Sequence, residues 1–402
     1  MKRRAWLHQG CAHCLALAGL SQGLPAWAQA AGGAASAAAS APEAADGYAL
    51  PPRFERPDLA SDEGGLWAMM DREERRLRRS PFRLREPGLE DYLTALACRL
   101  GGGHCPDIRV YAVRAPFFNA SMAPNGMMQV WSGLMLRADN EAQLAAVIGH
   151  EIGHYLQRHT LERLRDIRAR SAFGQFLGLF GVVGLIGSIA AMAGALAFSR
   201  DQEREADRIG VDLMRRSGHD PREAATVWGN LLAELQATPG ADPTQESILF
   251  ATHPPSAERR DTLDALSIGS SGDKGEAAWR ARVAPLRREL LADEIKRGRP
   301  FETVALTTRL LGREPGDAEL LYCRGEAYRR RGVEGDTALA LADLLAAAAS
   351  PQAPPLAHRA LATLHRDAGD KAAARTAFEH YLAAAPDAPD AAMIRQNLEE
   401  LR

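Results

Sequence analysis

The sequence predicts an α+β, mainly helical protein, in which a domain with a small sheet precedes an α-solenoid of tetratricopeptide-like repeats. Three observations support this fold class. Apolar residues recur at helical spacing over most of the chain. A short strand-like run, Met127–Trp131, follows the turn signal Pro124-Asn125-Gly126. After residue 276, glycines and prolines return at regular intervals.

Length and charge set the first limits. The chain has 402 residues, which predicts two or three domains at roughly 100–200 residues each. Lys and Arg number 49 and Asp and Glu number 51, so the formal charge is 49 − 51 = −2. Domains that bind nucleic acid usually carry a strong basic excess. We therefore expect no nucleic-acid partner.

The N-terminus has the order of a secretory signal peptide. Basic residues at 2–4 precede an apolar stretch at 14–20, and a small-residue cleavage site ends at Ala28. A short membrane anchor is the alternative, but the apolar stretch falls short of the ~20 residues of a membrane span. We expect residues 1–28 to be removed and residues 29–48 to form a low-complexity linker.

Export changes what the cysteines indicate. Two of the five cysteines lie in the signal peptide, and Cys98 and Cys105 stand close together in the remaining chain. In an oxidising compartment this pair could form a small disulfide loop, or it could stay as two thiols. Cys323 lies in a helical pattern and is expected to be a small buried residue.

The rest of the chain divides at a second linker. Residues 49–266 form a mixed domain, the linker covers 267–275, and residues 276–402 form the repeats. Glycines that end helices recur at spacings of 34 and 37, and prolines that close helices at 36 and 35: Gly298, Gly332 and Gly369, then Pro315, Pro351 and Pro386. Tyr328, Ala373 and Phe378 occupy packing positions typical of tetratricopeptide repeats. An unrelated helical bundle is the alternative. Stacked repeats offer a surface for partner chains.

An HExxH motif carries the chemistry of the mixed domain. Residues 140–166 predict one amphipathic helix that begins with the capping pair Asn140 and Gln143. His150 and His154 stand at i and i+4 on one face, as two ligands of one metal must. The alternative is a pair of exposed helical histidines.

A second helix, predicted over 199–218, supplies a carboxylate. Glu203 and Asp207 share one face at i and i+4. Glu203 would complete a His₂Glu zinc site with one zinc per chain, and Asp207 would accept the second ring N–H of a ligand histidine. Glu205 is the alternative ligand, and a solvated charged helix is the alternative for the whole segment.

Glu151 lies one step round the helix from His150, where it can reach a water but is badly placed as a ligand. Zinc lowers the pKa of its bound water and polarises a peptide carbonyl. Glu151 would then take the water proton as general base and pass it to the leaving amine. The predicted activity is that of a metalloendopeptidase.

Three motifs in order carry a family resemblance: HEIGH, EREADRIG and the sequence HPP-x-x-x-R at His253 to Arg259. The chain resembles the zinc peptidase family that includes HtpX and the CAAX prenyl proteases, and in particular its exported members with repeats. The resemblance implies Glu203 as third zinc ligand, a Gram-negative periplasmic location and quality control of outer-membrane proteins. It further implies unfolded or misassembled protein substrates and, through the repeats, the outer-membrane β-barrel assembly machinery as a partner.

His253 lies in a loop that the resemblance places near the metal, and two prolines stiffen the chain after it. We expect His253 to occupy the open zinc position as a latch until substrate arrives. Arg259 would then stabilise the oxyanion or dock the substrate backbone. Two alternatives for His253 stay open: a hydrogen bond to a neighbouring loop, or a contact to the transition state without zinc.

The run 171–198 has no charge over 28 residues and is long enough for a membrane span. Yet His150 and His154 precede it and Glu203 follows it, so a single span would separate the ligands of one metal. Two spans need ~40 residues. We therefore expect a folded-back helical pair or a segment in peripheral contact with a membrane surface, with an integral membrane protease as the rival.

Two further alternatives concern function. The run 127–131 could be an edge strand that binds an extended substrate by β-augmentation, or an ordinary core strand. The whole chain could act as a periplasmic chaperone or adaptor through its repeats, with an idle metal site. The intact set of His150, Glu151, His154 and Glu203 favours the peptidase.

Overall fold

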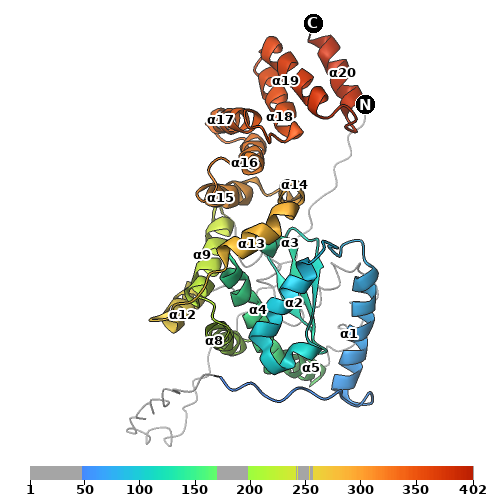
Figure 1. Cartoon of the computed structure of the whole chain (residues 1–402), viewed down its shortest axis with the longest axis vertical. Coiled ribbons are helices and arrows are strands. Elements are labelled where there is room, and N and C mark those ends of the chain that lie inside the picture. The colour runs from blue at the N-terminus through green and yellow to red at the C-terminus, as the bar shows by residue number, and fades with distance from the viewer. Residues whose placement is uncertain (1–47, 170–197, 241, 243–252, 254–256, 402) are drawn as a thin grey trace, which may run out of the picture. The chain divides into compact units, whose positions relative to one another are not determined.

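The computed structural model describes residues 48–169, 198–240, 242, 253 and 257–401. These residues belong to one compact unit. They are mainly helical with one small sheet (Figure 1), which confirms the predicted α+β, mainly helical fold.

Some of the predicted segments cannot be compared with the structure. The signal peptide 1–28, nearly all of the linker 29–48 and the apolar run 171–198, apart from Phe198, lie outside the described residues. In the part of the chain that is described, no helix has both the length and the apolar character that a membrane span needs.

The helices fall into an N-terminal and a C-terminal group. The first group comprises α1 (Asp62–Arg79), α2 (Leu89–Gly101), the 3-10 helix η1 (Gly102–Asp107), α3 (Ser132–Arg137), α4 (Glu141–Leu156), α5 (His159–Ala169), α8 (Arg200–Arg216), α9 (Arg222–Gln236) and α12 (Ala257–Ser267). The second group comprises α13 (Glu276–Val283), the 3-10 helix η2 (Ala284–Leu286), α14 (Arg287–Arg297), α15 (Pro300–Leu311), α16 (Ala318–Arg331), α17 (Asp336–Ala348), α18 (Pro355–Asp367), α19 (Lys371–Ala384) and α20 (Ala391–Glu400).

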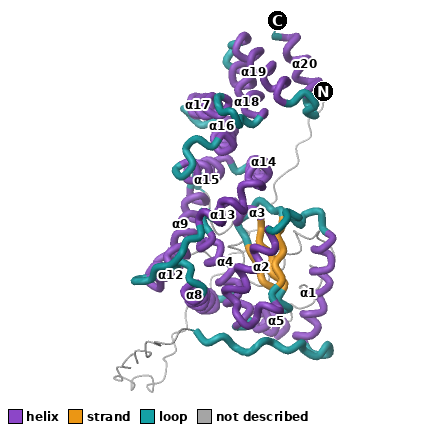
Figure 2. Tube along the Cα trace, in the orientation of Figure 1, coloured by secondary structure: helices purple, strands orange, loops and turns teal. Residues whose placement is uncertain are grey.

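In the described part of the chain the strands form one three-stranded sheet in the order β1-β3-β2. Figure 2 shows these strands in orange beside α2. Strand β3 (Met127–Trp131) runs parallel to β1 (Arg109–Val113) and antiparallel to β2 (Ala120–Met122). The strand predicted at 127–131 is therefore present, but it is central, and the edge-strand interpretation of it was wrong. The turn at Gly126, with φ of +85°, folds β2 back on β3 and leaves β2 at the edge.

The two faces of the sheet pack against different helices. On one face Tyr111 and Trp131 form a cluster with Leu77 of α1. On the other face Val110 and Met128 join the main core, together with residues of α2 and α4. Side chains alternate between the faces of a strand, so this two-sided packing explains why every residue of β3 is buried, the polar Gln129 included.

Helices α4 and α8 pack closely because small residues face each other. A Cβ added at Gly153 would lie 2.9 Å from the carbonyl oxygen of Ala206, and one at Gly210 would lie 3.0 Å from the backbone nitrogen of His150. A Cβ at 2.9 Å from backbone is essentially never seen, and one at 3.0 Å would require the neighbouring backbone to shift, so glycine at both positions allows this close approach. The packing brings the HExxH helix and the helix of Glu203 together.

Helices α14 to α20 each pack against the next along the chain after the second linker. Glycines end α14 and α16 and follow α18 with φ of +74°, +64° and +81°, as the spacing predicted: Gly298, Gly332 and Gly369. Leu290, Leu306 and Leu320 belong to the same buried core as Ile148 of α4. The first helices after the linker therefore share one core with the helix that carries the HExxH motif.

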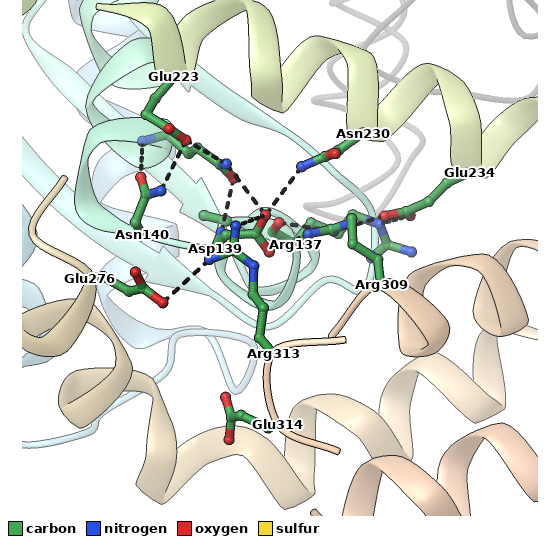
Figure 3. Close-up of polar contacts among 12 residues, drawn as sticks. Arg137, Asp139, Asn140, Glu223, Asn230, Glu234, Glu276, Arg309, Arg313 and Glu314 are labelled. Atoms are coloured by element: carbon green, nitrogen blue, oxygen red, sulfur yellow. Dashed lines mark hydrogen bonds and ion pairs between the residues drawn. The ribbon is translucent and has the colours of Figure 1, made fainter. Parts of the chain in front are cut away.

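Buried charges join the same elements (Figure 3). Arg137, at the end of α3, donates to Glu234 of α9 at 2.7 Å. It also donates to Glu294 of α14 at 3.1 Å. Arg309 of α15 pairs with Asp139 and with Glu234. Burial favours the neutral form of Glu294, yet the neighbouring charge of Arg137 lowers the pKa of this carboxyl. The network lies directly before Asn140, the N-cap of α4.

Replacing Arg137 should destabilise the protein strongly. Arg137→Met leaves the carboxylates of Glu234 and Glu294 buried without their shared counter-ion, which should lower the free energy of unfolding by about 3 kcal/mol. Arg288→Met is the matched control, because Arg288 and its partner Glu319 form an exposed ion pair worth about 0–1 kcal/mol. Urea denaturation of both variants measures the difference, and equal losses would show that burial of the network does not matter.

Candidate metal centre

Helix α4 presents two histidines at the centre of the fold. Asn140 caps its N-terminus by accepting a hydrogen bond from the backbone N–H of Gln143 at 2.9 Å. Every residue of the helix is buried, including His150 and His154. Their spacing of four residues places both rings on the face that α8 covers.

Helix α8 presents two carboxylates toward those histidines. Ser199 and Gln202 form the capping box that starts the helix. Glu203 and Asp207 follow on one face, and both are buried. Buried carboxylates are rare without partners. The histidines opposite Glu203 and Asp207 supply these partners.

Four side chains converge where the helices meet. His150, His154, Glu203 and His253 each offer one ligand atom, and these atoms lie within 4.8 Å of one another. The Nε2 atoms of His150 and His154 are 3.0 Å apart, and Nε2 of His154 is 3.3 Å from Oε1 of Glu203. Nδ1 of His253 is 2.8 Å from the same Glu203 oxygen.

These distances fit one tetrahedral metal ion. Zn–N and Zn–O bonds of about 2.0–2.1 Å at tetrahedral angles place neighbouring ligand atoms about 3.3 Å apart. Imidazole nitrogens and a carboxylate are the ligand types that zinc prefers in catalytic sites. The residues present therefore fit a single zinc ion, with three ligands from α4 and α8 and a fourth from His253.

Glu151 stands beside this group without belonging to it. Its side chain is buried, and the pKa of its carboxyl is raised by burial. Among the described residues its Oε1 atom has no hydrogen-bond partner, and Nε2 of His253 lies 3.5 Å away. A buried carboxylate whose proton affinity is raised and whose oxygen is available is suited to accept a proton.

Comparison with known families identifies the domain that holds this centre. Residues 83–267 match the family model for peptidase family M48. The chain carries an M48 peptidase domain. The predicted resemblance to this group of zinc peptidases is thereby confirmed, and the matched segment contains the four converging residues and Glu151.

Several curated proteins are similar over the same region. The β-barrel assembly-enhancing protease of Escherichia coli strain K12 is 31% identical over 221 residues, which are 49% of this chain and 44% of that protein. The mitochondrial metalloendopeptidase OMA1 of Arabidopsis thaliana is 34% identical over 159 residues, 40% of this chain and 31% of that protein. The chain thus spans less than half the length of these relatives.

Asp207 holds the imidazole of His150 in the M48 domain. Oδ1 of Asp207 lies 2.8 Å from Nδ1 of His150, so Nε2 of this ring points to the converging group. Burial opposes ionisation of Asp207, but the charges of Arg259 and His150 lower the pKa of its carboxyl. An ionised acceptor behind a ligand histidine fixes its tautomer and strengthens it as a ligand. This is the placement predicted for Asp207.

Arg259 lies beside the metal centre and contacts two of its carboxylates. Its Nε and Nη2 atoms donate to the two oxygens of Asp207 at 2.7 and 2.6 Å, and Nη1 lies 2.9 Å from Oε2 of Glu203. Its guanidinium also stacks on the ring of Trp228 at 3.9 Å. In this arrangement Arg259 positions two carboxylates, while its predicted contact with an oxyanion or a substrate backbone stays a prediction.

His159 is a functional residue that the sequence reasoning missed. Its Nδ1 lies 2.9 Å from Nδ1 of His154, the relation that Asp207 has to His150. On its other side, Nε2 of His159 lies 3.3 Å from Oε2 of Glu205. Glu205, the alternative ligand, therefore reaches His159 and is absent from the converging group.

The helix predicted over 140–166 is two helices, and this break explains the omission. α4 ends at Leu156, Arg158 adopts a left-handed backbone with φ of 58°, and α5 starts at His159. The turn redirects the chain so that His159 points back at His154. A spacing of five residues gives no such signal on a continuous helix. Phe198, which stacks on His154 at 3.9 Å between ring centres, also carried no local signal.

Proposed function

We propose that the chain is a zinc-dependent endopeptidase in which His150, His154 and Glu203 bind zinc and Glu151 is the general base. The observation that carries the proposal is the convergence of these buried ligand atoms, with His253, within 4.8 Å of one another beside the buried carboxyl of Glu151. The M48 match and the metalloendopeptidase relatives support the same activity.

The residues divide the chemistry between them. Zinc bound at this site would supply a Lewis acid for the scissile carbonyl and lower the pKa of the attacking water. Glu151 removes the proton from that water and delivers it to the leaving nitrogen. Asp207 and His159 hold the two ligand rings in orientation. Strand β2 is at an edge of the sheet that the described residues form, so an extended substrate would add to it by β-augmentation.

Removing the metal tests this proposal. Incubation with a zinc chelator should abolish digestion of unfolded casein, and one equivalent of zinc per chain should restore it. Magnesium, which requires octahedral oxygen ligands, should not restore it. Digestion that continues in a chain shown to be free of metal would contradict the proposal.

We propose a periplasmic location and a role in quality control of outer-membrane proteins. The signal-peptide pattern at 1–28 supports export. The disulfide between Cys98 and Cys105 supports an oxidising compartment. The E. coli relative is named a β-barrel assembly-enhancing protease, which supports misassembled outer-membrane proteins as substrates. The segment 171–198 would contact a membrane surface peripherally.

The helices after residue 276 would bind unfolded substrates or the β-barrel assembly machinery, as tetratricopeptide-like repeats do. A chaperone or adaptor with an idle metal site is the alternative function. One experiment separates the two functions. Under the alternative, the parent chain digests no casein, and the parent and the Glu151→Gln chain prevent aggregation of an unfolded protein equally well.

We further propose that His253 acts as a latch on the metal site. Its Nδ1 lies 3.2 Å from Nε2 of His150 and 2.8 Å from Glu203, so it stands where a fourth ligand belongs. The side chain is 4% exposed, so His253 is buried at this position, which a substrate carbonyl would have to share. Substrate must displace His253 before Glu151 can act.

Removing the latch should raise activity. His253→Ala should increase the basal rate of casein digestion by about threefold or more, because a larger fraction of the chains has an open metal position. His365→Ala, in the C-terminal helices, is the control for loss of a histidine and should leave the rate unchanged. A folded, zinc-loaded His253→Ala chain with activity at or below the parental rate would exclude the latch and favour a transition-state contact.

A further inference from the structure

A charged cleft lies apart from the metal centre, between the chain around residue 54, helix α1 and the start of β1. Its volume is about 560 Å³, within the range of about 300–1,000 Å³ that small-ligand sites occupy. Five arginines and three carboxylates line it, a net charge of 5 − 3 = +2: Arg53, Arg56, Arg75, Arg78 and Arg109, with Asp71, Glu74 and Asp107.

The three carboxylates are fully engaged. Asp107 accepts two hydrogen bonds from Arg53, at 2.8 and 2.6 Å. Glu74 accepts two hydrogen bonds from Arg109, at 2.7 and 2.6 Å. Burial raises the pKa of Glu74, but the hydrogen bonds that it accepts outweigh this effect and lower the pKa to about 2. Asp71 accepts from Arg56 and from Asn125. The negative charge of the cleft is therefore neutralised from within.

Two donors in the cleft remain without an acceptor. Arg75 of α1 makes no hydrogen bond and no ion pair with any residue that the structure describes. The indole Nε1–H of Trp67, about two turns earlier on the same helix, is buried and also lacks an acceptor in the described chain. The buried indole donor costs free energy while it lacks an acceptor, and a ligand that accepts from it would recover that cost. Arg75 is exposed, so it contributes positive charge to the cleft and is not a buried donor.

The cleft continues toward the metal centre through Phe54. This residue lines the cleft and also lines a small pocket with His154 and with Met122 of the edge strand β2. Its ring packs edge-on against Tyr155, the neighbour of His154, at 5.1 Å. Pro124 and Asn125, which follow β2, lie in the small pocket and the cleft respectively.

We propose that this cleft binds a carboxylate of an extended peptide substrate, with Arg75 and Trp67 as the recognising donors. The proposal rests on the proposed peptidase function, and it adds a preference for acidic substrates. A substrate paired with the edge of β2 reaches the cleft past Phe54. The carboxylate comes from an acidic side chain or from the chain's own C-terminus, since both present the same acceptor.

Binding of synthetic peptides to the full mature chain tests this. The zinc-loaded Glu151→Gln chain is titrated with three ten-residue peptides that share one uncharged, extended sequence and differ only in their carboxylates. One has an internal glutamate and an amidated end, one has a free C-terminal carboxylate and no acidic side chain, and one has neither. We expect at least one charged peptide to bind about fivefold more tightly than the neutral one, and more weakly as salt rises.

Three variants locate the contact. Arg75→Gln should remove the fivefold preference, and Trp67→Phe, which keeps a ring and loses the N–H, should reduce it. Arg72→Gln is the matched control, because Arg72 is an exposed arginine on the same helix that does not line the cleft. It should keep the preference. Which charged peptide responds to Arg75→Gln identifies the source of the carboxylate.

Equal affinity for all three peptides, or equal losses in Arg75→Gln and Arg72→Gln, would overturn the proposal. A second result would also overturn it: the chain binds vesicles of anionic lipid, Arg75→Gln weakens that binding, and no peptide is preferred. The cleft would then be assigned to a membrane surface. A failure of the proposed peptidase function can be told apart from a failure of this proposal. It would appear as casein digestion that does not depend on Glu151, regardless of which peptides bind.

Discussion

Glu151→Gln should abolish proteolysis while the fold and the zinc content stay as in the parent. Glutamine has the same size and can occupy the same buried position, but it cannot accept the water proton. General acid–base catalysis contributes about 10²–10⁴-fold to rate, so we expect a loss of about 10³-fold in casein digestion. Zinc is retained because Glu151 is outside the group of four converging ligands.

Glu162→Gln is the control for this substitution. Glu162 is an exposed residue of α5 that accepts a hydrogen bond from Gln202, so the same chemical change there should leave the rate within about twofold. Digestion by Glu151→Gln at the parental rate, in a chain without contaminating protease, would mean that another group activates the water.

Glu203→Ala should release zinc. Glu203 contributes the carboxylate ligand and contacts both histidines as well as His253. Substitution of residues behind the ligands already costs about 10–100-fold in metal affinity, so loss of a ligand should cost at least about 100-fold. Zinc content after dialysis against a weak chelator measures this loss.

Glu205→Ala separates the two acidic candidates. Glu205 is 40% exposed at its side chain and reaches only His159, so its removal should leave the zinc content near one per chain. The reverse result, zinc lost with Glu205→Ala and kept with Glu203→Ala, would place the ligand on the other face of α8.

The metal ligands were predictable because they depend on local geometry. The i, i+4 spacing on α4 and α8 defines which side chains share a face, and the Ser199 and Gln202 capping box fixes where α8 begins. Gly153 has no side chain between the two histidines, and α8 packs closely at this position. Each of these inferences needs only a continuous helix.

Features that depend on the path of the chain between elements were not predictable. Arg158 has no intrinsic preference for a left-handed backbone, so the sequence did not announce the turn that brings His159 to His154. The order of strands is also non-local, which is why 127–131 proved central. The sequence could place Arg259 near the site, but its hydrogen bond to Asp207 depends on tertiary packing and could not be predicted.

The second linker illustrates a further limit. Its Gly and Ser content predicts a flexible connection at 267–275, yet Asp273 exchanges backbone hydrogen bonds with Gly218 and Asp220, and helices on both sides share one core. Composition records the local preference of a segment, while pairing with a distant turn is decided by the fold.

X-ray absorption at the zinc edge of the resting, zinc-loaded chain tests the central claim most directly. We expect only nitrogen and oxygen ligands at about 2.0–2.1 Å, with three imidazoles from His150, His154 and His253 in the resting chain and two after His253→Ala. A sulfur ligand at about 2.3 Å, or a spectrum without imidazole scattering, would contradict the assignment of this site as the metal centre.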